Sequence, residues 1–307
     1  MNWRSKALLQ RVFSCVPKGA QLNYLCSRYL TKTLPQPESV TRLDYSFAAN
    51  YLRYFRQAGE VPIEEAQFYE FGVGWNLTIP LSLYCLGVNR QLTTDIRRLL
   101  RPDLIAHSCR TLATMPLDPA PVRRPGRFCP AGNRTDFVSL LRNSFGIQYR
   151  APFDARMTAL ADKSVDYITA TKVLVFIPLK TLQGILKECA RILRPQGSMA
   201  VLLDYRDNYS YFDANIGVYN FLQYSDQTWE NIYNSSLFYQ NRLRHSDYQR
   251  LFDEAGFEVV VGEAGYDGPI EAARKKLEKI PLAARFKNYE IDDLAAARAT
   301  YVLRRKA

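Results

Sequence analysis

Apolar and polar positions follow two different rhythms along the chain, and their alternation predicts the class of fold. Short apolar runs bounded by glycine, proline or charged residues indicate strands at 66–71, 91–94, 147–150, 164–170, 199–203, 257–261 and 300–303. Between these runs, apolar residues recur every three or four positions, most clearly over 178–193. Strands that alternate with helices at this spacing predict a doubly wound α/β sheet.

The remaining helices follow from the same periodicity. We expect them at 76–86, from Asp95 onward, at 135–145, at 246–255 and at 270–279. The run from Met199 to Leu203 is apolar without interruption, which is typical of a strand buried on both faces of a parallel sheet.

Two regions depart from this rhythm. Residues 1–60 are helical in pattern and rich in aromatic residues, and Pro35 and Pro37 divide them. Residues 206–242 hold many tyrosines, phenylalanines and asparagines after the fifth strand, where such a fold builds a lid. We therefore expect an N-terminal helical extension or lid at 1–60, and a main domain at 61–307 with a cap insert at about 206–245.

Composition narrows the classes of function. With 307 residues and 47% hydrophobic content, the chain can bury a large core without disulfides or metals. The six cysteines are scattered, with no Cys-x-x-Cys pair, which favours reduced thiols and a cytoplasmic location. The two histidines, His107 and His245, are too few for a histidine-rich metal centre, so we predict no metal site.

The net charge of +11 raises the question of a nucleic-acid partner. The basic clusters at 97–101, 123–127 and 304–306 are separated by acidic stretches, a distribution that favours a solvated surface over an RNA track. No segment approaches the roughly 20 apolar residues of a membrane span.

The N-terminus carries an apolar helical stripe with basic residues beside it. The stripe consists of Trp3, Ala7, Leu8, Val12 and Val16. It can rest weakly on a membrane surface, although packing against the main domain is the commoner outcome for such a stripe.

The most informative segment is 68–76. An apolar strand ends in Glu70, and Gly72 and Gly74 follow, where the absence of a Cβ leaves backbone N–H groups uncovered. A helix that begins near Asn76 aims its positive end at the same place. Asp95 lies about 20 positions further on, the spacing at which nucleotide folds place an acid for ribose hydroxyls.

Over residues 64–305 the chain resembles the class I S-adenosylmethionine-dependent methyltransferases. Glu70, Gly72 and Gly74 match the first motif of that family, and Asp95 matches the acid that ends its second strand. Three further segments are similar to its later motifs: Val165–Ile168, Arg191–Gly197 and His245–Phe257. Two positions depart from the family pattern. Gln196, in the segment Arg191–Gly197, stands where glycine is usual, and Val173–Ile177, after the fourth strand, lacks the Glu-His pair that many relatives carry.

The resemblance implies a Rossmann-like, seven-stranded, mostly parallel sheet with helices on both faces, and S-adenosylmethionine as the cofactor. It implies cofactor contacts from Glu70, Gly72, Gly74, Asn76, Asp95, Asp154, Ala155 and Thr171. Plain structural roles stay open for each: a tight turn for the glycines, a helix cap for Asp95 and a loop turn for Asp154. A dinucleotide oxidoreductase is disfavoured because Leu77 occupies the place of its third glycine.

Methyl transfer to a hydroxyl also requires a proton acceptor and a cleft for the acceptor molecule. The candidates near the expected cleft for moving the proton are His245, Tyr205, Asp204 and Asp207. The candidates for contact with the substrate are Tyr45, Tyr51, Lys172, Tyr209, Tyr211 and Arg242. The leading hypothesis is a methyltransferase for a hydroxyl of a small metabolite, glycan precursor or natural product. The alternatives are an RNA methyltransferase and a non-catalytic binding protein of the same fold.

Overall fold

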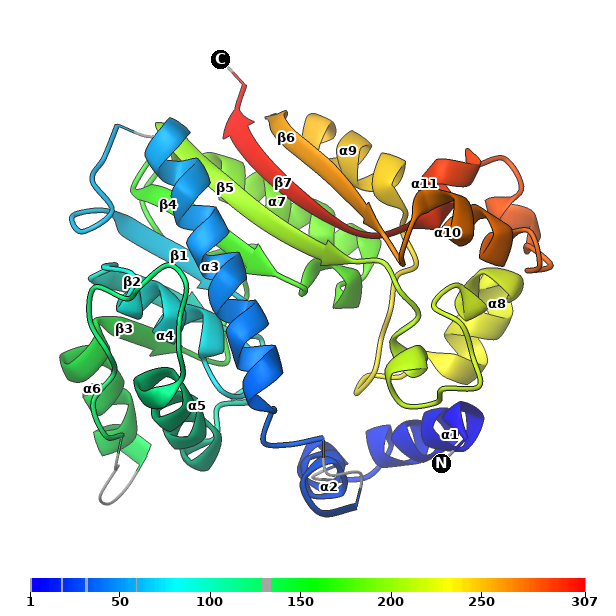
Figure 1. Ribbon diagram of the computed structural model, residues 1–307, viewed down its shortest axis with the longest axis horizontal. Helices are drawn as coiled ribbons and strands as arrows, with labels where there is room; N and C mark the ends of the chain where they lie inside the picture. The colour runs from blue at the N-terminus through cyan, green and yellow to red at the C-terminus, as the bar shows by residue number, and fades with distance from the viewer. Residues whose placement is uncertain (1, 18, 31–32, 59, 129–133, 307) are drawn as a thin grey trace.

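A single seven-stranded sheet forms the centre of the molecule (Figure 1). The computed structural model describes residues 2–17, 19–30, 33–58, 60–128 and 134–306. The strands are β1 Gln67–Phe71, β2 Arg90–Thr94, β3 Ile147–Arg150, β4 Val165–Thr171, β5 Leu193–Asp204, β6 Phe257–Tyr266 and β7 Ala296–Arg305. Their order is β3-β2-β1-β4-β5-β7-β6. Every pairing among β1 to β5 is parallel, whereas β7 runs antiparallel to both β5 and β6. The predicted Rossmann-like, mostly parallel sheet is confirmed.

Helices cover both faces of this sheet. They are α1 Trp3–Ser14, α2 Gly19–Leu25, α3 Glu38–Ala58, α4 Thr78–Cys85, α5 Pro102–Thr114, α6 Arg134–Phe145, α7 Leu179–Ile192, α8 Asp226–Thr228, α9 His245–Glu254, α10 Ile270–Leu277 and α11 Ile291–Ala295. In Figure 1, α3 crosses in front of the sheet, and α7 and α9 lie behind it. Phe55 of α3 stacks on Tyr167 of β4 with ring centroids 4.4 Å apart, and Leu182 and Leu186 of α7 are fully buried against the other face.

Several boundaries differ from those predicted. The helix expected from 76 begins at Thr78, because Leu77 takes a left-handed conformation with φ 55° and interrupts the backbone there. The segment after Asp95 is irregular, and its helix begins only at Pro102, a residue well suited to the first helical turn. Strand β5 is longer than expected, at Leu193–Asp204, because its pairing with β4 already begins at Leu193.

The N-terminal helix α1 packs on the aromatic insert. The Trp3 ring lies 5.3 Å from that of Tyr209 and 4.6 Å from that of Tyr233, and the Trp3 N–H donates to the Asp213 carboxylate at 2.9 Å. In Figure 1, α1 lies below α8, so the two regions that break the sequence rhythm lie next to one another. The division of the chain at residues 60 and 61 stays a prediction.

Two other expectations concern cysteines and membranes. Cys85, Cys109 and Cys189 are buried free thiols, Cys15 is an exposed free thiol, and Cys129 lies outside the described residues. Within the described ranges, each helix is too short or too polar to cross a bilayer.

Candidate active site

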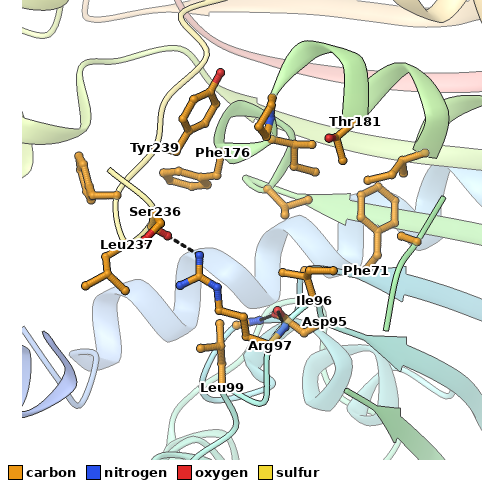
Figure 2. Close-up of a pocket in the computed structure, with 18 of the residues that line it drawn as sticks. Phe71, Asp95, Ile96, Arg97, Leu99, Phe176, Thr181, Ser236, Leu237 and Tyr239 are labelled. Atoms are coloured by element: carbon orange, nitrogen blue, oxygen red, sulfur yellow. Dashed lines mark hydrogen bonds between the residues drawn. The ribbon is translucent and has the colours of Figure 1, made fainter. Parts of the chain in front are cut away.

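A cavity of about 770 Å³ opens at the carboxyl ends of β1, β2 and β4. The strand order reverses between β1 and β4, and doubly wound sheets bind their ligands at such a switch point. The insert closes the opposite side with residues 234–239, as Figure 2 shows for Ser236, Leu237 and Tyr239. The site therefore lies between the sheet edge and the insert.

The two glycines that follow β1 have different surroundings. Gly72 has φ 71°, and a Cβ added there would lie 2.1 Å from Cγ2 of Val173, so the strand end packs directly against the segment after β4. Gly74 has φ 69°, and a Cβ there would meet no atom within 4 Å. Both line the cavity. Gly72 is thus required for packing, whereas Gly74 keeps the floor of the cavity open.

Asp95 connects this turn to the end of β2. Its Oδ2 accepts a hydrogen bond from the Gly74 N–H at 3.2 Å, and its Oδ1 accepts one from the Arg97 N–H at 3.1 Å. The side chain is buried at the cavity wall, and this burial raises the pKa of its carboxyl group. The carboxylate is held in place by backbone donors and has lone pairs left to accept from a ligand.

Two residues directly after Asp95 also line the cavity, although the sequence reasoning had not singled them out. Ile96 is 62% exposed despite its apolar side chain, and Arg97 donates from its guanidinium to the Ser236 carbonyl of the insert (Figure 2). An exposed aliphatic residue beside a carboxylate suits the flat face of a nucleobase. The signal was present in the sequence as an apolar residue immediately after the predicted ribose acid.

Asp154 and Ala155 lie at the same end of the cavity as Asp95. The Phe153 N–H donates to the Asp95 carbonyl at 2.9 Å, which joins the two segments. The Asp154 carboxylate accepts from the Arg156 guanidinium at 3.0 and 2.6 Å, and these hydrogen bonds hold the pKa of Asp154 below its usual range.

Two of the predicted cofactor residues lie outside the cavity lining. Glu70 is buried behind the glycine turn, and among the described residues its Oε2 has no hydrogen-bond partner. Burial raises the pKa of Glu70 to about 8. Asn76 points away, because its amide donates to the Gln36 side chain at 2.7 Å.

Thr171, the last residue of β4, and Lys172, directly after it, both line the cavity. The Thr171 hydroxyl lies 3.1 Å from the Tyr51 hydroxyl, and the Lys172 ammonium pairs with Asp44 at 3.0 Å. Tyr51 itself is buried behind Thr171 and is not part of the lining. Tyr45, also expected to contact substrate, is buried and donates to the Pro119 carbonyl at 2.8 Å.

The residues expected to move a proton lie apart from the cavity lining. His245 begins α9, where its Nδ1 lies 2.7 Å from the Tyr301 hydroxyl and 3.3 Å from that of Tyr205. Burial lowers the pKa of this histidine. Asp204 pairs with Arg206 at 2.7 Å, and the buried Asp207 accepts from Asn220 at 2.8 Å. The sequence predicted that all of them flank the cleft, but none of the four lines the cavity.

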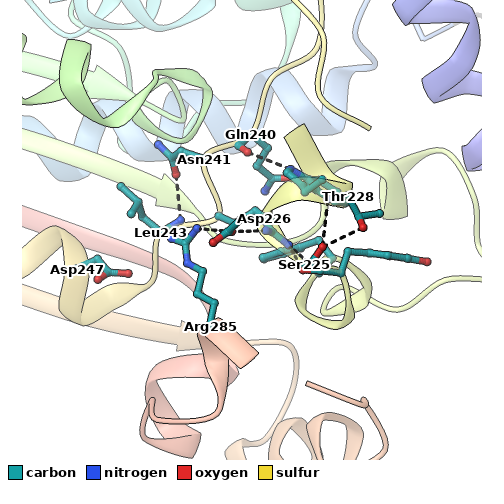
Figure 3. A network of polar contacts seen from close by, with 12 residues as sticks. Ser225, Asp226, Thr228, Gln240, Asn241, Leu243, Asp247 and Arg285 are labelled. Atoms are coloured by element: carbon teal, nitrogen blue, oxygen red, sulfur yellow. Dashed lines mark hydrogen bonds and ion pairs between the residues drawn. The ribbon is translucent and has the colours of Figure 1, made fainter. Parts of the chain in front are cut away.

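Three predicted substrate residues hold the insert together. Tyr209 is fully buried and donates to the Tyr233 carbonyl at 2.8 Å, while Tyr211 donates to Asp204. Arg242 is buried and donates to the Phe221 and Tyr224 carbonyls and to Asp226. Burial lowers the pKa of Arg242 to about 10. Asp226 also pairs with Arg285 at 2.9 Å, so this polar network anchors the insert to the C-terminal region (Figure 3).

The acceptor side of the cavity is mainly apolar. Its lining there includes Val173, Phe176, Ile177, Leu237 and Phe238. Phe176 belongs to the segment that lacks the Glu-His pair, and its ring is 41% exposed at the cavity. Glu230 and Tyr239 add polar atoms from the insert, and burial raises the pKa of Tyr239 to about 12.

The cavity and the buried acid behind it fit a cationic adenosyl ligand in three respects. Gly74 leaves open space beside exposed backbone, Asp95 presents a fixed carboxylate, and Glu70 keeps a buried oxygen without a partner among the described residues. A sulfonium or ammonium group nearby would favour the charged form of that buried acid.

Comparison with known proteins gives one family match. Residues 139–201 match the family model described as a methyltransferase domain. No curated protein matches the chain.

Solved structures that match this chain include three with low sequence identity to it. A chain of the complex between the Haloferax volcanii Trm112 methyltransferase activator and a putative methyltransferase is 15% identical, with 86% of this chain and 94% of that chain covered and a TM-score of 0.43. A putative sarcosine dimethylglycine methyltransferase from Galdieria sulphuraria is 14% identical, with 86% of this chain and 86% of that chain covered and a TM-score of 0.46. An S-adenosylmethionine-dependent methyltransferase from Clostridium acetobutylicum is 10% identical, with 94% of this chain and 99% of that chain covered and a TM-score of 0.47.

Proposed function

We propose that this chain, which its fold and its family match identify as a class I S-adenosylmethionine-dependent methyltransferase, methylates a hydroxyl group of a small and largely apolar molecule. The observation that carries the proposal is the apolar wall opposite the glycine turn, formed by Phe176 and by residues 237–238 of the insert. Such a wall matches an aromatic or aliphatic acceptor, such as a natural-product scaffold, better than a bare sugar.

S-adenosylmethionine is the cofactor that the family match implies, and when bound it supplies a methyl group already activated on a sulfonium. We assign the Asp95 carboxylate to the ribose hydroxyls and the exposed backbone at Gly74 to close approach of the ligand. Ile96 and Phe153 provide apolar contact for the adenine ring, and Asp154 accepts from its amine. Glu70, buried behind the turn, would supply negative charge near the cationic end once that cation favours its ionised form.

The chain's part in the reaction is to orient the acceptor, to exclude water and to take up a proton. Residues 234–239 cover the cavity, and the contact from Arg97 to the Ser236 carbonyl fixes that cover to the sheet edge. We assign proton uptake to Glu230, because it is the carboxylate that the insert brings to the described lining. The lining contains no histidine among the described residues, and His245 is engaged with Tyr301.

An RNA substrate receives less support from the same cavity. Arg97 and Lys172 are the basic residues of the described lining, and both are already engaged, Arg97 by the Ser236 carbonyl and Lys172 by Asp44. RNA sites combine free basic groups with stacking platforms along an open groove.

A turnover assay tests the proposal. Release of S-adenosylhomocysteine would be followed by mass spectrometry with a panel of small hydroxylated aromatic and aliphatic compounds, and with structured RNA in parallel. We expect methylated product from at least one compound, and a fall of about 100-fold in kcat for Glu230→Gln with little change in cofactor affinity. Glu278→Gln, an exchange of the same kind at the exposed C-cap of α10 and outside the cavity lining, serves as the control. Product from RNA alone, or product only at nitrogen or carbon atoms, would refute the proposal.

A further inference from the structure

Helix α1 is turned with part of its apolar surface toward solvent. Lys6 and Gln10 are buried, at 7% and 5% exposure, whereas Leu8 and Val12 are exposed, at 64% and 52%. In an ordinary surface helix the apolar stripe faces the core and the charged residues face water. In α1, Trp3 and Ala7 do face the core, but Lys6 and Gln10 share that buried side while Leu8 and Val12 face solvent.

The inward orientation is fixed by Trp3 and has an energetic cost. Trp3 is buried among the aromatic residues of the insert, including Tyr209 and Tyr233. Because α1 follows from that anchor, Lys6 and Gln10 are desolvated: burial lowers the pKa of Lys6 to about 8, and Oε1 of Gln10 has no partner among the described residues. Burying polar groups while leaving leucine and valine in water is unfavourable unless the outward face meets an apolar surface.

Helix α2 and the π-helix after it, Cys26–Leu30, extend the exposed apolar surface. Leu22 and Leu25 are 39% and 40% exposed, and Tyr29 is 70% exposed. In Figure 1, α2 lies beside α1 at the same lower edge of the molecule. We call these residues together the α1–α2 surface, which consists of Leu8, Val12, Val16, Leu22, Leu25 and Tyr29.

The charged residues among the first 37 positions of the chain are all basic. The first acidic residue of the chain is Glu38, and the residues before it include a set of basic ones, namely Arg4, Lys6, Arg11, Lys18, Arg28 and Lys32. Arg4 and Arg11 are exposed, and the helical repeat places them on the same side of α1 as Leu8 and Val12. Apolar side chains flanked by arginines, with a tyrosine at the edge, are typical of helices that lie in the headgroup region of a bilayer.

We propose that the α1–α2 surface binds the surface of an anionic membrane, with its apolar side chains at the acyl boundary and its arginines on the lipid phosphates. An anionic bilayer satisfies both features at once, because it attracts the one-signed charge and also removes the leucines and valines from water. This proposal does not depend on the identity of the methyl acceptor.

The position of the surface relative to the cavity gives the binding a consequence. Asn23 of α2 lines the cavity, and Tyr24 stacks at 5.0 Å on Trp75, which lines it too. A membrane held against Leu22 and Leu25 would therefore lie beside the side of the cavity that α2 forms. An apolar acceptor dissolved in the lipid would then have a short route to the site.

Co-sedimentation of the full-length protein with vesicles tests the proposal. We expect binding to vesicles of phosphatidylglycerol and phosphatidylcholine in equal parts, weak binding to phosphatidylcholine alone, and release as salt is raised. Leu8→Ser/Val12→Ser should weaken binding about tenfold or more through lost apolar contact. Arg4→Gln/Arg11→Gln should weaken it about tenfold and should remove most of the preference for the anionic lipid.

The matched control is Val122→Ser/Val260→Ser, which removes two exposed valines elsewhere, on the loop after α5 and on β6. It should bind vesicles as the wild type does. Circular dichroism melts of all variants establish that they are folded, and cofactor titration reports on the cavity separately. Equal vesicle binding by wild type and Leu8→Ser/Val12→Ser would overturn the proposal. So would a wild-type dimer that ignores vesicles and becomes monomeric in that variant, because the surface would then join two copies of the chain.

Discussion

The Asp95 carboxylate accepts a hydrogen bond from the backbone N–H of Gly74 at 3.2 Å, which ties the end of β2 to the glycine turn after β1. The two residues are 21 positions apart in the chain and adjacent in the site. This contact holds the carboxylate at the cavity wall in a fixed orientation before any ligand arrives. A preorganised acceptor of this kind binds hydroxyl groups with little further loss of entropy.

Removing the carboxylate should therefore weaken cofactor binding strongly. For Asp95→Ala we expect an affinity about 10- to 100-fold lower for S-adenosylmethionine, because hydrogen bonds to a charged acceptor contribute about 1.5–3 kcal/mol. Isothermal titration calorimetry measures the change. Asp162→Ala removes a carboxylate that is 73% exposed and lies outside the cavity, and it should bind as the wild type does. Equal affinity of both variants for S-adenosylmethionine would show that Asp95 does not bind the cofactor.

The two glycines should respond differently to alanine. Gly72→Ala places a Cβ 2.1 Å from Val173 at φ 71°, so we expect a loss of about 2–4 kcal/mol in the free energy of unfolding. Gly74→Ala has open space and only the backbone strain of φ 69°, about 1–2 kcal/mol. Its main effect should be weaker cofactor binding, because the methyl group intrudes on the cavity floor. Urea unfolding and calorimetry on the same samples separate the two effects, and a reversed ranking in stability would contradict this account.

Glu70 should make stability depend on pH. Burial raises its pKa to about 8, so between its ordinary pKa near 4.5 and pH 8 the folded chain keeps a proton that the unfolded chain has lost. The folded state binds more protons in this window, and the contribution of Glu70 to stability therefore falls as the pH rises. Glu70→Gln removes that dependence.

The measurement is the free energy of unfolding of wild type and Glu70→Gln from pH 5 to pH 9. As the pH rises, the free energy of unfolding of Glu70→Gln should increase by a few kcal/mol relative to that of the wild type. Glu64→Gln, at an exposed glutamate, should run parallel to the wild type. A constant difference between Glu70→Gln and wild type would show that Glu70 is ionised in the folded protein throughout.

Local sequence patterns predicted the sheet well because each strand has its own apolar signature. The uninterrupted run at Met199–Leu203 and the amphipathic face of α7 were both found buried. The sequence likewise predicted the glycine turn and Asp95, because a strand end, a turn and an acid at a fixed spacing are all local features. Boundaries were less accurate where a single backbone conformation decides them, as at Leu77.

Contacts between distant segments were beyond local patterns. The aromatic residues of the insert have the same composition whether they line a cavity or form a core, and Tyr209 turned out to pack on Trp3, more than 200 positions away. His245 begins a segment that resembles a late motif of the family, yet its side chain contacts Tyr301 of β7 and does not line the cavity. Tyr45 and Tyr51 were expected at the cleft, and both hydroxyls are taken by other parts of the fold.

His245 should accordingly be dispensable for chemistry. For His245→Ala we expect unchanged cofactor affinity and kcat within about twofold, together with a loss of about 1–2 kcal/mol in stability from the lost contact with the Tyr301 hydroxyl. Turnover on the best acceptor and thermal unfolding give the two readings. Tyr301→Phe, which removes the same hydrogen bond from the other side, should give a similar loss of stability. A fall of about 100-fold in kcat for His245→Ala alone would restore the histidine as the general base.

The most direct test of the central claim is a crystal structure of the protein with S-adenosylhomocysteine, the demethylated cofactor product. The account predicts density at the carboxyl ends of β1, β2 and β4, with the ribose hydroxyls on Asp95, the chain passing over Gly74 and the adenine ring beside Ile96. Density for the compound elsewhere on the protein, or a cavity that stays empty at a saturating concentration, would contradict it.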